Sequence, residues 1–187
     1  MKSVIAIDMG FAAVGIACFH VAENGSGKLH GAHAFKTKKN AQRRKGLRVA
    51  DDDAERCREL TQWLEGMVDY LAGRPAGAIV ELPSGGAQGA RANRCMGMAT
   101  GVVVTFLTMR GIPTEWITPQ AVKKAATGRI YAKKEEMIAR AWQRFPLGNA
   151  MAWEKEHIAD ACWTFEAGKS TPLVQALMRI EETTNGT

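Results

Sequence analysis

The feature that most constrains the fold is an apolar run near the start of the chain, residues 3–7, which ends in an acidic residue, Asp8. A continuous run of this length, rich in β-branched side chains, is typical of a strand buried on both faces of a sheet. A carboxylate at the end of such a strand is costly unless hydrogen bonds, a cation or a metal keep it ionised. The run therefore predicts a covered sheet with an acid of structural or functional importance at its edge.

The remaining pattern predicts an α/β fold with a mixed five-stranded sheet that is flanked by helices. Two strands, at residues 12–20 and 28–35, follow the first after short turns, which gives a three-stranded antiparallel meander. Two further strands, at 78–82 and 114–117, alternate with helices and are expected to be parallel. The sheet therefore combines a meander with parallel strands.

The expected helices have apolar stripes at helical spacing. They lie at about residues 51–71, 90–110, from Thr118-Pro119 onward, 133–144 and 153–167. Three aspartates at 51–53 are expected to cap the first helix and to place favourable charge at its N-terminus. We expect residues 1–170 to form one domain and residues 171–187 to form a C-terminal tail.

The first predicted strand also gives information on the cellular location of the protein. Asp8 lies in the middle of the segment that a secretory signal peptide would need to be hydrophobic, which argues against such a peptide. No stretch approaches the roughly 20 apolar residues that span a bilayer. The four cysteines are scattered, without a CxxC pair or histidines at zinc spacing, as is typical of a reduced, intracellular protein. We therefore expect a cytoplasmic protein.

A second carboxylate, Glu81, ends the apolar strand at 78–82 in the way that Asp8 ends the first strand. Ligand sites in α/β sheets favour the carboxyl ends of strands. If the two strands are neighbours, both acids point into one site. A single acid at a strand end is more often a cap or an ion-pair partner, so neither acid alone predicts a function.

A third acid, Asp160, lies in the last predicted helix, three residues after His157, so the two side chains share a helix face. Carboxylate oxygens with one imidazole suit Mg²⁺ or Mn²⁺. A lone helix histidine is more often structural than a ligand. Glu156 lies near the same face, and the spacing alone leaves open whether His157 or Glu156 completes a metal shell.

The net charge of +6, from 25 Lys and Arg against 19 Asp and Glu, is compatible with a polyanionic partner. Basic residues cluster beside each acid-bearing element, where they could bring a phosphate backbone across the site. The candidate DNA-binding residues are Lys36, Lys38, Lys39, Arg43, Arg44, Lys45, Arg91, Arg94, Lys123, Lys124 and Lys133. The simpler interpretation of the basic segment at 36–48 is a solvated loop.

Four segments keep the same order and spacing as the motifs of one known family. They are Asp8-Met9-Gly10 with Gly15, Glu81 followed by residues 96–102, residues 117–128, and His157-Ile158-Ala159-Asp160-Ala161. Together, over about residues 2–168, they resemble the RuvC family of Holliday junction resolvases. This resemblance implies an RNase H-like fold.

The resemblance also implies an activity. Its four metal ligands would be Asp8, Glu81, His157 and Asp160, holding two Mg²⁺ ions per active site, with Mn²⁺ also supporting activity. Lys123 and Lys134 match family lysines that act on the scissile phosphate, so Lys134 would be catalytic with the four ligands. The implied reaction is two-metal hydrolysis of DNA that leaves 5′-phosphate and 3′-hydroxyl ends. A homodimer that cuts four-way junctions is implied, with the helix at 90–110 a candidate interface.

Two features depart from the family pattern. Leu82, Pro83 and Ser84 follow Glu81, where the family often carries an aromatic residue that enters the junction. The basic segment at 36–48 is also longer and more basic than usual. Phage-borne relatives vary in such ways, so the resemblance is compatible with a phage-encoded protein that works in the cytoplasm of its host.

Three other functions compete with a dedicated resolvase. The first is a broader endonuclease for forks, flaps and other branched DNA, which would use the same metal chemistry. The second is a non-catalytic junction-binding protein, against which the intact set of acids argues. The third is an actin-like ATPase or sugar kinase, because the segment from Asp8 to Gly15 also resembles their first phosphate loop. Those proteins need a second domain and a second phosphate loop, which this sequence lacks.

Overall fold

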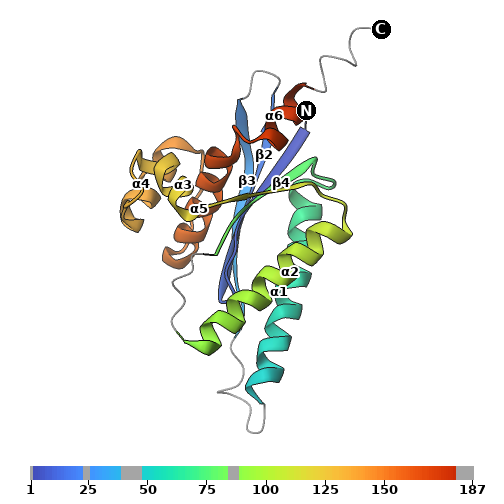
Figure 1. Ribbon diagram of the computed structural model, residues 1–187. Helices are drawn as coiled ribbons and strands as arrows, with labels where there is room; N and C mark the ends of the chain where they lie inside the picture. The colour runs from blue at the N-terminus through green and yellow to red at the C-terminus, as the bar shows by residue number, and fades with distance from the viewer. Residues whose placement is uncertain (1, 23–25, 39–47, 84–88, 180–187) are drawn as a thin grey trace.

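The computed structural model describes residues 2–22, 26–38, 48–83 and 89–179, and within them it confirms the mixed five-stranded sheet (Figure 1). The strands are β1 (Lys2–Asp8), β2 (Ala13–Val21), β3 (Gly27–Lys36), β4 (Gly77–Glu81) and β5 (Thr114–Ile117). Their order in the sheet is β3-β2-β1-β4-β5. The first three strands form the antiparallel meander, and β4 and β5 are parallel to β1.

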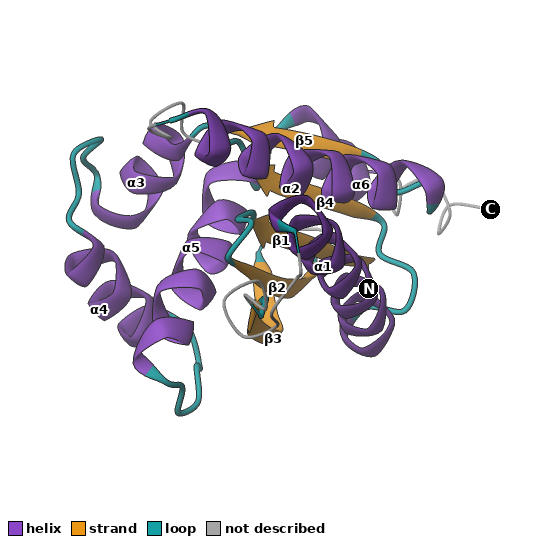
Figure 2. Ribbon diagram, turned by 90° about the horizontal axis from the view of Figure 1, so that it is seen from below, coloured by secondary structure: helices purple, strands orange, loops and turns teal. Residues whose placement is uncertain are grey.

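Helices cover both faces of this sheet (Figure 2). They are α1 (Val49–Leu71), α2 (Ala90–Met109), α3 (Pro119–Thr127), α4 (Lys134–Arg144), α5 (Ala152–Gly168) and α6 (Pro172–Arg179). The helices α1 and α2 lie on one face, and α5, backed by α3 and α4, lies on the other. Thr118 caps α3 by accepting a hydrogen bond from the N–H of Ala121, and Pro119 takes the first helical position, as the sequence predicted.

The central strand β1 is buried on both faces, as its apolar run predicted. Val4 and Ala6 belong to the core beneath α5, and Ile5 and Ile7 belong to the core beneath α1 and α2. Side chains alternate between the faces of a strand, so an uninterrupted apolar run is required when both faces are covered. The strand can therefore present only its end, at Asp8, to a site.

Two glycines let α5 approach the sheet closely. A Cβ at Gly15 in β2 would collide with the backbone of His157, and a Cβ at Gly168 would collide with the side chain of Ile79 in β4. Between these points the ring of Phe165 stacks on that of Phe19, with their centroids 3.8 Å apart. The helix α5 therefore crosses β2, β1 and β4 in direct contact with their side chains and backbone.

The start of α1 differs from the prediction. Its N-cap is Arg48, which makes no side-chain cap hydrogen bond, and Asp51 pairs with Arg48 instead of capping. Asp52 and Asp53 are buried in the first two turns. Acidic residues near a helix N-terminus were expected for their charge, but burial gives these two a role in packing that composition does not reveal.

The described part of the predicted C-terminal tail is a helix. Residues 172–179 form α6, where Val174 is fully buried and the N–H of Leu173 donates to Oε1 of Glu115, 3.1 Å away. At the other end of the helix, Nζ of Lys2 donates to the carbonyl of Leu177. The helix therefore covers the β1–β4–β5 side of the sheet. Among the described residues no helix is long and apolar enough to cross a membrane.

Candidate active site

Two acids meet at one edge of the sheet. The strands β1 and β4 are parallel neighbours, with Ile7 opposite Val80, so Asp8 and Glu81 occupy equivalent positions at the carboxyl ends of the two strands. The expectation that these strands are adjacent is therefore confirmed. Both acids lie at an edge where α/β sheets commonly bind ligands.

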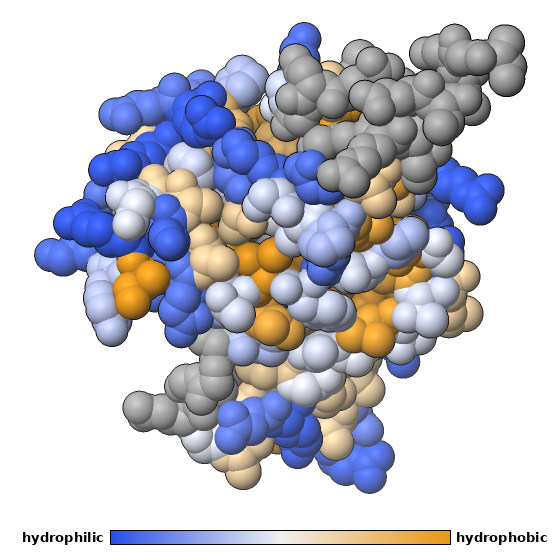
Figure 3. Space-filling view, turned by 45° about the horizontal axis from the view of Figure 1, so that its top comes forward, coloured by the Kyte–Doolittle hydropathy of each residue, from blue (hydrophilic) through white to orange (hydrophobic). Residues whose placement is uncertain are grey.

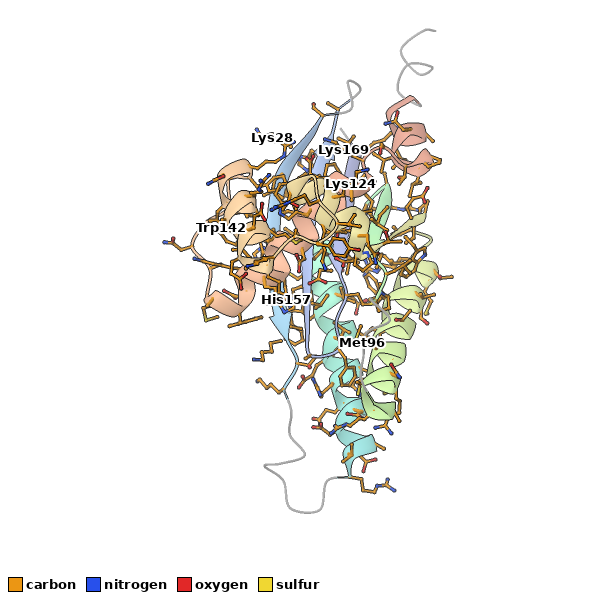
Figure 4. The ribbon with its side chains drawn as sticks, turned by 60° about the vertical axis from the view of Figure 1, so that its left-hand side comes forward. Lys28, Met96, Lys124, Trp142, His157 and Lys169 are labelled. Carbon is orange, nitrogen blue, oxygen red and sulfur yellow. The ribbon has the colours of Figure 1, made fainter. Side chains whose placement is uncertain are left out.

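The helix α5 adds His157 and Asp160 to this pair. In the antiparallel register of β1 and β2, Asp8 lies opposite Gly15, and the backbone of His157 packs against that glycine. The Nδ1 atom of His157 lies 2.8 Å from Oδ2 of Asp8, and its N–H donates to the carboxylate. Figure 4 labels His157 on the lower part of α5, near the strands.

The site carries more negative charge than its own residues neutralise. Burial, reinforced by the charges of Asp8 and Asp160, raises the pKa of Glu81 to about 8. Burial, with the charges of Asp8 and Glu156, raises the pKa of Asp160 to about 7. A nearby cation would reverse both shifts, because it would stabilise the ionised carboxylates.

The same carboxylate charges act on His157 in the other sense, because they stabilise its charged form. Burial alone would lower the pKa of His157, but the hydrogen bond to Asp8 and the charges of Asp8, Glu156 and Asp160 outweigh burial and raise it. The raised pKa of His157 thus reflects the surplus of carboxylates around it. The site favours positive charge on the groups next to it.

Two lysines approach the acids from α3 and α4. The charge of Lys123 acts on Glu81, and that of Lys134 acts on Asp160. Lys134 also forms an ion pair with Glu156, and this pair raises its pKa. The two candidates that the spacing left open thus have different partners in the structure, because His157 contacts Asp8 whereas Glu156 pairs with Lys134.

The donor set fits a hard divalent cation, although no three His, Cys, Asp or Glu side chains of the described residues stand together in the arrangement of a metal centre. Asp8, Glu81 and Asp160 nevertheless act on one another through their charges, and His157 bonds to Asp8. Oxygen-rich sets of this kind suit Mg²⁺ and Mn²⁺. The buried hydroxyl of Thr164 lies beside Glu81 and partly offsets the rise in the pKa of that carboxylate. Thr164 was missed by the sequence analysis, although it follows Asp160 by four residues, on the same helix face.

The predicted DNA-binding residues fall into four groups, of which Arg91 and Arg94 of α2 form the last. Lys39, Arg43, Arg44 and Lys45 lie outside the described residues. Lys36 ends β3 and lies over the ring of Trp153 in α5, and Lys38 follows it. Lys123, Lys124 and Lys133 belong to α3 and to the N-cap of α4. Figure 3 shows hydrophilic side chains crowded over the α3–α4 side of the molecule.

Arg91 and Arg94 have a structural partner that the sequence did not predict. Both donate to Asp53 of α1, over distances of 3.1 and 2.6 Å, and the Asp53 side chain is only 1% exposed. Burial would raise the pKa of Asp53, but the two guanidinium groups outweigh it and lower the pKa. These arginines join α2 to α1, and each remains about half exposed.

The fold is similar to that of known resolvases. It matches RuvC of Thermus thermophilus with 21% identity and a TM-score of 0.64, over 89% of this chain and 95% of that one. It matches the same organism's RuvC in complex with a Holliday junction substrate with 22% identity and a TM-score of 0.65, over 100% and 98% of the two chains. The yeast mitochondrial Holliday junction resolvase Ydc2 matches with 14% identity and a TM-score of 0.61, over 98% and 82%. No protein-family model and no curated protein matches the sequence. At these identities the likeness establishes the RuvC-like RNase H fold predicted from the four segments.

Proposed function

We propose that this protein is a metal-dependent endonuclease that cuts branched DNA, and four-way junctions in particular. The observation that carries the proposal is the meeting of Asp8, Glu81 and Asp160 at one sheet edge, with His157 bonded to Asp8. This set occurs on a fold shared with two proteins whose names describe them as RuvC or a Holliday junction resolvase. Fold alone does not give function, so the site carries the argument.

Four side chains would hold the metal: Asp8, Glu81, His157 and Asp160. When bound, two divalent cations would supply an activated water and charge stabilisation at the leaving 3′ oxygen. The crowded carboxylates support this assignment, since the raised pKa values of Glu81 and Asp160 mark a site that lacks positive charge. Mg²⁺ is the expected ion, and Mn²⁺ is expected to substitute for it.

The lysines would act on the phosphate. Lys134 lies beside the acids on the first turn of α4 and would neutralise the charge that develops on the phosphoryl oxygens during cleavage. Glu156 keeps the Lys134 ammonium in place in the absence of DNA. Lys123, which acts on Glu81, would contact the same phosphate from α3. The products would carry 5′-phosphate and 3′-hydroxyl ends.

Cutting both strands of a junction symmetrically requires two sites, so we propose a two-fold homodimer. The helix α2 presents Val104 and Met109 to solvent, and Met109 is 83% exposed. Met109 lines an apolar groove between α1 and α2, to which Val102 and Phe106 also contribute. Burial of this groove against a second copy would remove exposed apolar surface, which supports α2 as the interface.

The test compares a labelled four-way junction with a linear duplex of the same sequence in Mg²⁺. The expected result is paired, symmetric nicks in the junction alone, lost in Asp8→Asn and retained in Asp51→Asn, a matched change at a partly exposed acid away from the site. Cleavage of forks and flaps at similar rates would favour a general nuclease for branched DNA. Tight binding without any cleavage in Mg²⁺ or Mn²⁺ would overturn the catalytic proposal.

A further inference from the structure

The turn between α3 and α4, residues 128–133, carries two apolar side chains that face solvent. Tyr131 is 89% exposed and Ile130 is 42% exposed. Among the described residues, Tyr131 has neither a hydrogen bond nor a ring contact. Single exposed apolar residues are ordinary on protein surfaces. Here, however, an almost fully exposed aromatic ring follows an exposed isoleucine in a short turn.

The backbone of this turn is held in place at its start. Gly128 ends α3 with a φ of 78°, and its N–H donates to the carbonyl of Lys124. The hydroxyl of Thr127 donates to the carbonyl of Lys123 and accepts from the N–H of Arg129. The guanidinium of Arg129 is fixed in turn by Glu136 of α4. The exposed side chains are therefore presented from an anchored loop.

The surroundings of Tyr131 indicate what would cover it. Arg129, Lys133 and Lys134 flank it in sequence, and the charge of Lys134 acts on Asp160 and Asp8 in the acidic cluster. A basic surface attracts a phosphate backbone, and an exposed ring beside it offers a stacking surface to a base. Bases within a regular duplex are already stacked on both faces, so the ring suits a base that is unstacked or unpaired.

We propose that Tyr131 stacks on an unstacked base of the DNA next to the phosphate held at the acidic cluster, with Ile130 extending the contact. This inference rests on the proposed function. It would supply from the α3–α4 turn the aromatic contact that Leu82 and Pro83 cannot supply after Glu81. The contact selects DNA in which stacking is interrupted, as at the centre of a junction, over intact duplex.

The chain offers a matched control, because it has one other tyrosine. Tyr70, at the end of α1, is 72% exposed and lies edge-on to His33 on the opposite face of the sheet. The experiment measures binding of a fluorescent four-way junction and of linear duplex by anisotropy, in Ca²⁺ so that affinity is read without depending on turnover. It compares Tyr131→Ala, Tyr131→Phe and Tyr70→Ala with the unaltered protein.

We expect Tyr131→Ala to weaken junction binding roughly 5- to 30-fold, in the range of one lost base–aromatic stack, and to leave duplex binding unchanged. Tyr131→Phe and Tyr70→Ala should bind the junction like the unaltered protein. The salt dependence should persist in Tyr131→Ala and become shallower in Lys133→Ala, because only the lysine contacts phosphate. A 5-iododeoxyuridine at the junction centre should cross-link on irradiation to the turn in the unaltered protein and fail to do so in Tyr131→Ala.

Three outcomes separate this inference from the proposed function. If Tyr131→Ala binds the junction as tightly as the unaltered protein, or loses junction and duplex binding equally, base stacking by Tyr131 is wrong even if cleavage occurs. If binding depends on Tyr131 but no DNA is cut in Mg²⁺ or Mn²⁺, the stacking contact is supported and the proposed nuclease activity is wrong. If the unaltered protein binds no DNA, both are overturned.

Discussion

The backbone carbonyl of His157 occupies the space that a side chain on Gly15 would need. Because Gly15 lies opposite Asp8 in the β1–β2 register, this close approach brings α5 down onto the end of β1. The result is the 2.8 Å contact between Nδ1 of His157 and Oδ2 of Asp8. The glycine seven residues after the first acid is thus part of the site without contributing a chemical group to it.

We predict that Gly15→Ala destabilises the protein and separates α5 from β1. A methyl group would meet backbone atoms, which cannot move aside like the end of a flexible side chain, so the helix must shift. Overpacking of this kind typically costs roughly 1–3 kcal/mol in the free energy of unfolding. Thermal unfolding would measure the loss, and cleavage should fall further than the loss of folded protein explains, because His157 moves away from Asp8.

The matched control for this change is Gly66→Ala. Gly66 lies on the exposed face of α1, with no atom within 4 Å of the added methyl group. This substitution should raise stability by about 0.5–1 kcal/mol, because alanine is the better helix former. If Gly15→Ala behaved like Gly66→Ala, the close approach of α5 would not be what places His157.

We predict that Glu81→Gln stabilises the metal-free protein at pH 8 while abolishing cleavage. The folded-state pKa of Glu81 is about 8, against an ordinary value of 4.5, so the folded protein binds this proton more tightly than the unfolded chain does. The contribution of Glu81 to stability is therefore fully present at low pH and is lost as the pH rises from about 4.5 to 8. The amide of the glutamine variant stays uncharged, so the variant does not lose this stability as the pH rises.

The measurement is the midpoint of thermal unfolding from pH 5 to pH 8.5 in EDTA. The two proteins should agree at the acidic end and diverge as the pH rises, with the glutamine variant higher. Mg²⁺ should then raise the midpoint of the unaltered protein at pH 8 and have much less effect on the variant, since binding requires the ionised carboxylate. Parallel curves at every pH would mean that Glu81 is not held in a crowded acidic cluster.

Each acid of the candidate site interrupts a recognisable sequence pattern, which is why the sequence could single it out. Asp8 and Glu81 end apolar strand runs, and Asp160 lies beside the buried stripe of α5, so alternation and helical spacing place all three. The adjacency of β1 and β4 then follows from ordinary sheet topology. Alternation and helical spacing are local sequence patterns, and only the relative placement of the elements depends on the tertiary structure.

Other features depend on contacts between segments far apart in the sequence. The burial of Asp53 is decided by two arginines of α2 about 40 residues away, and nothing in its own helix indicates them. The helix α6 depends on its docking against Lys2 and Glu115, so its short segment looked like a tail. Likewise, the Lys134–Glu156 ion pair requires the packing of α4 on α5.

We predict that the double substitution Arg91→Ala and Arg94→Ala lowers stability more than either single change. Asp53 would remain buried without a cation, which is strongly unfavourable for a carboxylate. The lowered pKa of Asp53 means that the pair stabilises the protein above about pH 4 and that this contribution is lost as the pH falls further. Thermal unfolding at pH 7 and pH 3.5 would check both statements.

The control for the arginines is Arg48→Ala, which removes an ion pair with Asp51 on the exposed start of α1 and should change the unfolding midpoint little. If the double variant is as stable as Arg48→Ala but binds DNA less well, the arginines serve DNA alone. A loss of both stability and affinity would mean that they join α1 to α2 and contact phosphate with their exposed edges.

We predict that Lys134→Ala slows junction cleavage by about 100-fold while changing junction affinity little, because its charge is needed where the transition state develops negative charge. Lys155→Ala is the matched control, since Lys155 lies on α5 over the ring of Trp142 and has no contact with the acids. Glu156→Gln should lower the cleavage rate less than Lys134→Ala does, because it loosens the lysine without removing it. Single-turnover cleavage at saturating protein, with affinity measured separately in Ca²⁺, separates the two effects. Equal losses of rate and affinity in Lys134→Ala would make this lysine a binding residue and leave stabilisation of the phosphoryl oxygens to Lys123 or the metal.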